Sequence, residues 1–505
     1  MAVSTGPRPQ QALEAGDCGA AVNAVTVFDM SLPLVVDLDG TLTPTDTLIE
    51  SIFKLIKQQP LSLLLMPLWL MQGIAAFKSH IAQRVELSTS TLPYRQSLLS
   101  YLREQKALGR KLVLATAAHN TIAVSVAANL GLFDQVLATT ERHNLKGTNK
   151  LEAIRREVGE RFTYAGDSSA DLQIWRHSSA AILVGDAPHR YHKNHGSAQV
   201  EQVFPGTPAG LATWLRALRA HQWMKNMLLF VPLLTSFGFF DQQKVMLAVG
   251  GFVAFCLAAS ATYLLNDLWD LDNDRHHPKK FARPLASAEI SIPAALLAAG
   301  TGLFGALALA STIGLQFLLA LVTYLVITTA YSWVLKRIML VDVLVLALLY
   351  TLRILAGSFA IDVVTSSWLL AFSIFLFFSL ALVKRCSELV SLKPTETSTR
   401  GRDYRVSDLA VLWPLGTAAG LCSVIVFGLF VTTLAGEQRY GTPELLWLVG
   451  LGLLYWISRL WIKTNRGEMH DDPLVFAIKD RSCRLAVLAM VVVTLTAYFL
   501  QLDLS

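Results

Sequence analysis

Long apolar runs fill the second half of the chain, and short polar or charged stretches separate them. A helix needs about 20 mostly apolar residues to cross a bilayer. The runs predict nine membrane spans, at 225–240, 246–265, 294–311, 315–333, 341–360, 367–383, 409–434, 444–462 and 485–502.

The first half has a different pattern, in which short apolar runs alternate with longer mixed stretches. Apolar runs at 34–38, 112–118 and 162–166 predict strands of a parallel sheet, whose site would lie at the strands' carboxyl ends. We expect two domains, an α/β Rossmann-like head and an all-α bundle of nine transmembrane helices. The predicted parts are a disordered N-terminus at 1–30, the head at 31–205 with a helical cap at about 46–103, a linker at 206–218, and the membrane domain at 219–505.

The stretch from Leu61 to Phe77 is the most apolar part of the predicted cap. Pro67 and Gly73 interrupt it, and it is too short to cross a bilayer. Two interpretations remain open: it rests on the membrane and presents a lipid-borne substrate, or it is a buried cap helix.

Composition agrees with a membrane protein. The chain is 53% hydrophobic and only 16% charged, which is too apolar for an ordinary soluble protein. Its net charge of +6 is modest, and its cations gather near the spans, so lipid headgroups and phosphates suit it better than nucleic acid. Five scattered cysteines and the absence of a cleaved signal pattern indicate a reducing compartment for the head.

Lys and Arg are concentrated in alternate loops between the spans. Because loops rich in these residues stay in the cytoplasm, we expect a multi-pass protein of the inner (cell) membrane with a cytoplasmic head.

Asn266 to Pro284 concentrates charge at the end of an apolar run. On a continuous helix, Asp267, Asp270 and Asp274 would fall at i, i+3 and i+7 within one arc. Three converging carboxylates favour Mg²⁺, which often shares its ligand shell with substrate phosphates. The cations that follow, Arg275, Lys280 and Arg283, could bind phosphate oxygens that the metal leaves free, so this stretch predicts a diphosphate site. The alternative is a solvated loop whose charges only set topology.

This stretch resembles the first aspartate motif of the UbiA superfamily of intramembrane prenyltransferases, beginning at Asn266, and the number of spans agrees with it. The resemblance implies that Asp267, Asp270 and Asp274 hold Mg²⁺ on a polyprenyl or sugar diphosphate. Members that prenylate aromatic rings carry a second aspartate motif after the sixth span, which is missing here. The residues in its place are mainly cationic, and they resemble the branch that transfers phosphoribose from phosphoribosyl diphosphate to a polyprenyl phosphate.

Several further residues of the membrane domain are candidates for phosphate binding. Arg353 lies well inside a predicted span, where a guanidinium needs a partner or a polar cavity. Lys225 could bind phosphate, or it could be an anchor whose ammonium reaches the membrane surface. The other candidates are Lys336, Lys384, Arg385, Arg402 and Tyr404.

The head carries four motifs in order. Asp37 and Asp39 follow the first strand, where one carboxylate could attack phosphorus while the other handles a proton. Thr116 ends the second strand and could bind a phosphate oxygen. Lys146 and Lys150 are alternative sources of an ammonium group, and Asp167 and Asp171 could hold a cation.

Together these motifs resemble the haloacid dehalogenase superfamily, especially its phosphoserine-phosphatase-like branch. The resemblance implies Asp37 as nucleophile, Asp39 as general acid and base, and Thr116 and Lys150 as phosphate contacts. It also implies Mg²⁺ bound by these aspartates, with Asp167 and Asp171 as supports. The alternative is a degenerate domain that has lost catalytic activity and is only structural.

The leading hypothesis is a membrane transferase, using phosphoribosyl diphosphate and polyprenyl phosphate, with a fused phosphatase that removes the 5-phosphate. One alternative transfers a polyprenyl group from its diphosphate to an aromatic or other small acceptor. The other is a transporter or lipid-binding scaffold, which paired repeats and broken helices at mid-membrane would favour.

Overall fold

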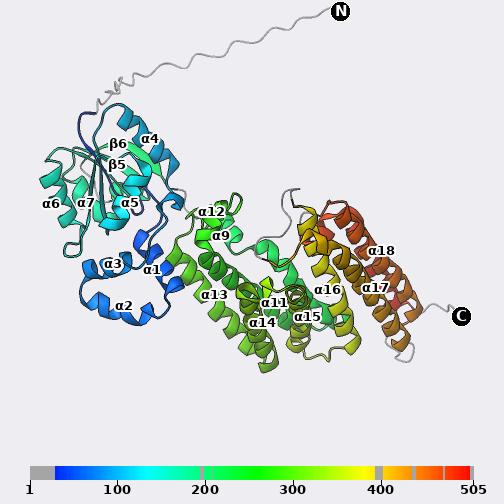
Figure 1. The fold of residues 1–505 in the computed structure, drawn as a ribbon. Coiled ribbons are helices and arrows are strands. Elements are labelled where there is room, and N and C mark those ends of the chain that lie inside the picture. The colour runs from blue at the N-terminus through cyan, green and yellow to red at the C-terminus, as the bar shows by residue number, and fades with distance from the viewer. Residues whose placement is uncertain are drawn as a thin grey trace, which may run out of the picture. The chain divides into compact units, whose positions relative to one another are not determined.

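The computed structural model (Figure 1) describes residues 29–193, 198–206, 209–392, 402–434, 440–469 and 472–500. Residues 1–28 of the expected disordered N-terminus lie outside these ranges. The chain forms two compact units. We call them the head unit (Met1–Thr43, Leu64–Thr89 and Tyr94–Gly206) and the membrane unit (Pro44–Leu63, Ser90–Pro93 and Thr207–Ser505).

The head unit contains a six-stranded parallel sheet in the order β3-β2-β1-β4-β5-β6. The central strand β1 is fully buried, as expected for a parallel sheet covered on both faces. Its Val35 pairs with Val113 of β2 and Tyr164 of β4. The strands are β1 (Leu34–Val36), β2 (Leu112–His119), β3 (Gln135–Thr139), β4 (Thr163–Gly166), β5 (Ala180–Gly185) and β6 (Gln199–Pro205).

Helices connect these strands, and their apolar faces close the core of the head unit. Trp175 and Tyr164 are the largest side chains of that core, with ring centroids 6.2 Å apart. The helices are α3 (Ile74–Ala82), α4 (Gln96–Ala107), α5 (Asn120–Leu130), α6 (Thr148–Glu157), η2 (Ser169–Asp171), α7 (Leu172–Trp175) and α8 (Ala187–Lys193). Two further helices, α2 (Ser62–Met71) and η1 (Thr89–Thr91), begin in one unit and continue in the other.

The membrane unit contains, within the described ranges, eight helices that are long and apolar enough to cross a bilayer. They are α11 (Gln242–Trp269), α13 (Ile292–Ile313), α14 (Leu315–Trp333), α15 (Val341–Ala360), α16 (Ser367–Val390), α17 (Leu409–Leu434), α18 (Leu446–Asn465) and α20 (Arg481–Phe499).

The run at 225–240, expected as the first span, is not one helix. It lies in the 3₁₀ helix η3 (Ala220–Phe230), the short α10 (Val231–Thr235) and η4 (Gly238–Phe240). Pro232 lacks a backbone donor, and Phe237 adopts a left-handed conformation (φ 54°), so a regular helix cannot continue through this run. In the described part of the chain, eight long helices and one shorter apolar segment therefore stand in the place of nine spans.

Shorter elements surround the polar end of α11. Ile49 and Phe53 of α1 (Thr47–Gln58) pack with Trp214 of α9 (Leu211–Ala217) and Leu271 of α12 (Leu271–His276). A helix therefore occupies most of the expected linker, and the first helix of the expected cap is grouped with the membrane unit. The remaining short elements are η5 (Lys280–Ala282), η6 (Leu335–Arg337), η7 (Val406–Asp408), η8 (Pro443–Leu445) and α19 (Pro473–Lys479).

Candidate active sites

Three carboxylates meet in the head unit at the carboxyl ends of β1 and β4. Asp37 follows β1, Asp167 follows β4, and Asp171 ends η2. One oxygen of each lies within 4.8 Å of the other two, and no other such cluster of three His, Cys, Asp or Glu side chains occurs among the described residues. Carboxylate oxygens at this spacing suit a hard divalent cation such as Mg²⁺. Asp39 lies in the following loop, where it bridges to Thr43.

Lys150 is the cation of this cluster. Its ammonium lies 2.9 Å from the carboxylate of Asp37 and donates to the hydroxyl of Tyr164 at 3.1 Å. That hydroxyl donates in turn to Asp171 at 2.7 Å. Lys150 is buried in α6, whereas Lys146, the alternative that the sequence left open, is exposed. The structure thus brings Lys150 to the expected nucleophile.

Negative charge in this cluster is only partly balanced. Burial raises the pKa of Asp37 to about 6, with Lys150 acting in the opposite direction. Burial, followed by repulsion from Asp171 and Asp37, raises the pKa of Asp167 to about 7. For Lys150, burial acts to lower the pKa, but the carboxylates of Asp37 and Asp171 outweigh it and raise the pKa. A divalent cation would relieve the repulsion between the carboxylates, so this donor set fits one.

The loop after β1 contacts the cluster of three carboxylates. Thr41 donates to Asp167 at 3.2 Å, and Arg95 donates to the carbonyl of Gly40 at 3.1 Å. Gly40 has a φ of 77°, and a Cβ added there would overlap the carboxylate of Asp167. A glycine is therefore needed for the loop to approach this close.

Thr116 lies fully buried in β2, and its hydroxyl accepts from the backbone of Ala118 at 3.0 Å. Next to it, the ammonium of Lys78 on α3 donates to the carbonyl of Ala117 at 2.6 Å. These contacts fasten α3 to the same edge of the sheet as the expected phosphate contact.

In the membrane unit, the aspartate motif lies where α11 ends and α12 begins. Asp270 separates the two helices (φ −92°, ψ 10°), so the continuous arc expected for Asp267, Asp270 and Asp274 is interrupted. Asp267 and Asp274 are buried, and the guanidinium of Arg283 joins them at 3.2 and 2.5 Å. Arg219 also pairs with Asp267. Arginine thus links two of the three expected carboxylates, Asp267 and Asp274.

The other residues of this motif differ in their partners. Lys280 lies 3.9 Å from Asp274, and the amide of Asn266 donates to the hydroxyl of Ser332 at 3.2 Å. Arg275, expected to contact phosphate, donates instead to both carboxylate oxygens of Glu50 in α1 at 2.7 Å, and to the carbonyl of Ala286 at 3.1 Å. Lys280 and Arg283 thus lie with the acidic residues, while Arg275 is bound to α1.

A second polar cluster lies among η3, α15, α16 and the segment before α19. The ammonium of Lys225 is 2.8 Å from Asp472 and 5.8 Å from the ring centre of Tyr350, and Lys384 is 3.5 Å from Asp472. Tyr263, one helical turn before Asp267, has the guanidinium of Arg219 over its ring at 4.7 Å. Trp223, two residues before Lys225 in η3, donates to Ser260 of the same helix α11 at 2.9 Å. The cationic cluster therefore adjoins the aspartate motif.

Arg353 is buried, as expected for a guanidinium inside a span, but its partners are neutral. It donates to Asn226 at 2.9 Å, to the hydroxyl of Tyr324 at 3.2 Å and to the carbonyl of Leu349 at 2.6 Å. These contacts hold α15 to η3 and α14 beside the cationic cluster.

Carboxylates pair with three further candidates for phosphate binding, which are Arg385, Arg402 and Tyr404. Arg385 lies 2.8 Å from Asp342, which also accepts from the hydroxyl of Tyr404. Arg385 and Arg402 both bind Glu388, the latter at 2.6 Å. Lys336 lies in η6, before α15 begins.

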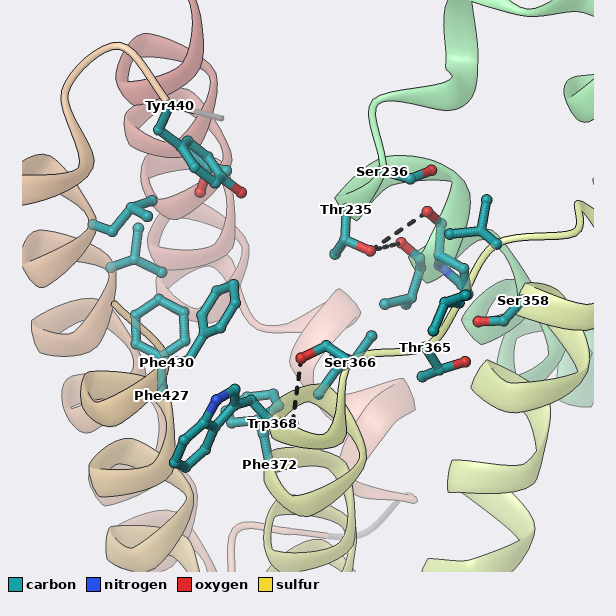
Figure 2. A pocket seen from close by; sticks show the side chains of 18 of the residues that line it. Thr235, Ser236, Ser358, Thr365, Ser366, Trp368, Phe372, Phe427, Phe430 and Tyr440 are labelled. Carbon is teal, nitrogen blue, oxygen red and sulfur yellow. Dashed lines mark hydrogen bonds between the residues drawn. The ribbon is translucent and has the colours of Figure 1, made fainter. Parts of the chain in front are cut away.

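An apolar cavity of about 330 Å³ lies at the other end of α16 (Figure 2). Trp368, Phe372, Phe427 and Phe430 line it, and Thr235 of α10 lies across from these rings. Trp368 precedes Lys384 by 16 residues on the same helix, which is about 24 Å. The cationic cluster and the apolar cavity thus lie at opposite ends of α16.

Four residues of these sites were not predicted: Glu50, Arg219, Asp342 and Asp472. Asp342 begins an apolar span, and a carboxylate there is a recognisable signal for a buried partner. Arg219 and Asp472 lie outside any regular pattern. Glu50 lies 225 residues from Arg275, so local spacing carries no sign of their pairing.

Comparison with known proteins places both units. Residues 227–478 match the model of the UbiA prenyltransferase family, and residues 34–176 match that of haloacid dehalogenase-like hydrolases. The chain is 39% identical over 466 residues to the uncharacterized protein y4nM of Sinorhizobium fredii, an alignment that covers 90% of this chain and 89% of that one. It is 30% identical over 303 residues to the decaprenyl-phosphate phosphoribosyltransferase of Mycobacterium tuberculosis, covering 58% of this chain and 96% of that one. A solved structure of a UbiA homolog from Archaeoglobus fulgidus bound to GPP and Mg²⁺ aligns with a TM-score of 0.43 at 18% identity, covering 57% of this chain and 100% of that one.

Proposed function

The chain belongs to the UbiA prenyltransferase family, with a haloacid dehalogenase-like domain ahead of it, and we propose that it transfers phosphoribose from phosphoribosyl diphosphate to a polyprenyl phosphate. It is an integral membrane protein with several spans. The observation that carries the proposal is the cationic cluster of Lys225 and Lys384 beside the aspartate motif. A cluster of this sign suits a substrate that arrives as a phosphate, and the sequence has no second aspartate motif for the diphosphate of an allylic donor.

In the proposed reaction, a phosphate oxygen of the lipid attacks the anomeric carbon of phosphoribosyl diphosphate. The bond from that carbon to the pyrophosphate oxygen breaks, and pyrophosphate leaves. Asp267, Asp270 and Asp274 would hold Mg²⁺, which would supply positive charge to the leaving pyrophosphate. Asp267 and Asp274 suit such a cation, provided that Arg283 turns from between them toward the pyrophosphate and that the carboxylate of Asp270 joins them.

The lipid phosphate would bind Lys225 and Lys384, whose anion in this structure is Asp472. Exchange of one anion for another keeps both ammonium groups paired, which limits the cost of burying them. The isoprenoid chain would extend along α16 toward the apolar cavity lined by Trp368 and Phe372.

For the head unit we propose phosphomonoester hydrolysis. Asp37 would attack phosphorus and form a phosphoaspartate, while Asp39 would give a proton to the leaving oxygen and Lys150 would hold Asp37 and balance the charge on the phosphoryl group. Water, giving a proton to Asp39, would then attack the phosphoaspartate and release inorganic phosphate. The product of the proposed transfer carries a 5-phosphate monoester, and this is the bond that we propose the head cleaves. The concentration of Lys and Arg in alternate loops supports a cytoplasmic head.

The test uses the full chain in proteoliposomes with Mg²⁺, polyprenyl phosphate and radiolabelled phosphoribosyl diphosphate, following label into the lipid phase. We expect label to enter the lipid with wild type and to fall by about 100-fold or more with Asp270→Asn, since a metal ligand is lost. Asp272→Asn is the matched control, because Asp272 has only a 3.9 Å ion pair with Lys54 in a half-exposed position. It should retain most of the activity.

Different outcomes separate the alternatives. Labelled lipid that keeps its monoester in Asp37→Asn but loses it in wild type would support both steps. If the wild type does not label the lipid but joins a polyprenyl diphosphate to an aromatic acceptor, the protein is a prenyltransferase and the proposal is wrong. Failure with both donors would favour a scaffold or transporter.

A further inference from the structure

The helix α2 presents an unusual surface for a segment between two motifs of a phosphatase domain. Six of its ten residues are large apolar side chains exposed to solvent, including Leu64 (75% exposed) and Met71 (84% exposed). Trp69 is the exception, because it is buried and stacks on His80 of α3 at 5.3 Å. The exposed residues therefore cover the helix surface away from Trp69, and they need an apolar partner.

The length of α2 restricts what that partner can be. Ten residues make a helix of about 15 Å, half of the roughly 30 Å hydrocarbon core, so α2 cannot cross a bilayer. Its sequence, SLLLMPLWLM, has no charged face to keep in water, so the helix suits immersion in one leaflet.

The chain enters α2 directly from a helix fixed at a membrane boundary. Lys57, in the last turn of α1, donates to the carbonyl of Trp269 at 2.7 Å, and its ammonium lies 5.8 Å from the centre of that ring. Trp269 ends α11 and stacks at 5.4 Å on Trp333, which ends α14. Paired tryptophans at the ends of two spans are typical of the membrane interface. Only four residues separate Lys57 from the start of α2.

The helix after α2 is fixed to the phosphatase site. Gly73, with a φ of 103°, separates α2 from α3, and Lys78 of α3 donates to the carbonyl of Ala117 beside Thr116. The segment between the phosphatase motifs is therefore fastened at one end to the membrane interface and at the other to the phosphate side of the sheet.

We propose that α2 inserts into the leaflet on the head's side of the membrane, and that the head serves phosphomonoesters carried by lipids. The bilayer is favoured over a second copy of the chain or another protein, because it is already present where Lys57 meets Trp269. The substrate class rests on the proposed phosphatase function, whereas the insertion of α2 does not.

Insertion is tested with single cysteines labelled with the fluorophore NBD, in a full chain whose native cysteines are replaced and which is reconstituted into liposomes. Leu64→Cys and Met71→Cys report on α2. Leu108→Cys is the matched control, because Leu108 is 72% exposed at the end of α4. We expect blue-shifted emission quenched by doxyl-labelled lipids at the first two positions, and quenching by aqueous iodide at the third.

Two outcomes would overturn insertion. Iodide quenching at Leu64→Cys and Met71→Cys would mean that α2 stays in water. Protection from both iodide and doxyl lipids would mean that protein covers α2, either a second copy or another chain.

The substrate class is tested with the double variant Leu64→Glu/Leu68→Glu and the control Leu108→Glu. Hydrolysis of p-nitrophenyl phosphate is compared with release of the 5-phosphate from preformed polyprenyl phosphoribose 5-phosphate in liposomes. We expect the double variant to lose about tenfold or more on the lipid and to keep its rate on the soluble ester, since membrane contact depends on buried apolar area. Equal losses on both substrates, no loss on either, or a wild type that hydrolyses only the soluble ester would overturn the lipid substrate. A wild type inactive on both would refute the phosphatase function, and the fluorescence would still decide insertion.

Discussion

Gly40 shows how one residue without a side chain sets the geometry of the phosphatase site. We expect Gly40→Ala to abolish most hydrolysis of p-nitrophenyl phosphate, because its methyl group would overlap the carboxylate of Asp167. Gly131→Ala is the control: Gly131 also has a positive φ, of 63°, but nothing within 4 Å of the added methyl group. It should cost about 1 kcal/mol of stability and leave the rate near that of wild type. Similar losses of rate in both variants would contradict this account.

Glu201 predicts a pH dependence of the head's stability. Burial acts to raise its pKa, but hydrogen bonds from Arg110, Tyr101 and Thr163 outweigh burial, so the pKa of Glu201 is lowered. A carboxylate with a lowered pKa stabilises the fold above its unfolded pKa of about 4.3, and that contribution is lost as the pH falls through the folded pKa. Protection of β6 peptides from hydrogen exchange, measured against the intrinsic rate at each pH, should therefore fall in acid, and Glu201→Gln should weaken that acid dependence. An unchanged dependence in the variant would assign it to other carboxylates.

At the residue scale, the sequence is informative where several motifs occur in a fixed order. Asp37 and Asp167 follow predicted strands, which places them at one edge of the sheet, and the structure groups them with Asp171 and Lys150. The sequence alone does not decide between Lys146 and Lys150, because both belong to the same stretch at the start of a helix. Asp472 was not assigned a role, because Asp472 and the neighbouring Asp471 lie between helices without a spacing that indicates a site. The partner of Arg275 also could not be predicted from the sequence, because its contact with Glu50 depends on how α1 and α12 pack together.

At the scale of elements, α1 and α12 are joined by a buried ion pair. The side chains of Arg275 and Glu50 are only 5% and 3% exposed. Removal of one partner from a buried pair costs about 3–5 kcal/mol, so Glu50→Gln should loosen α12 and reduce lipid labelling. Lys54→Met is the control, because its ion pair with Asp272 is long and half-exposed. Hydrogen exchange of α12 peptides measures the first effect and the labelling assay the second.

The same contact offers a stricter test by charge reversal. Glu50→Arg alone should be more damaging than Glu50→Gln, because it places two guanidinium groups together in a buried position. The double variant Glu50→Arg/Arg275→Glu should recover part of the labelling rate. If the labelling rate does not recover while hydrogen exchange of α12 is normal, Arg275 contacts the substrate directly.

Elements were predictable where the apolar pattern is long and regular, as in the eight long helices, and where short apolar runs precede the motif residues, as in β1, β2 and β4. Two local features departed from the pattern. The run at 225–240 has the composition of a span, yet Pro232 and the turn at Phe237 prevent one helix. The aspartate motif has helical spacing, yet the backbone breaks at Asp270, which composition does not reveal.

At the scale of the whole molecule, both proposed activities depend on carboxylates that suit Mg²⁺. We expect EDTA to stop lipid labelling and hydrolysis of p-nitrophenyl phosphate together, and added Mg²⁺ to restore both. Helical content, followed by far-UV circular dichroism, should not change, because the spans are held by apolar packing rather than by the cation. Asp167→Asn should raise the Mg²⁺ concentration needed for hydrolysis. The Mg²⁺ concentration needed for lipid labelling should stay as in wild type. Persistence of either activity in EDTA would remove the metal from that site.

The pairing of Glu50 with Arg275 also bears on how the protein is made. A ribosome completes α1 more than 200 residues before α12 emerges, so α1 must stay available until α11 has entered the membrane. A gene divided at residue 206 would place α1 and its ion-pair partner on different polypeptides. Such halves would have to reassemble through α1, and for this reason we expect co-expression, rather than either half alone, to recover the transferase.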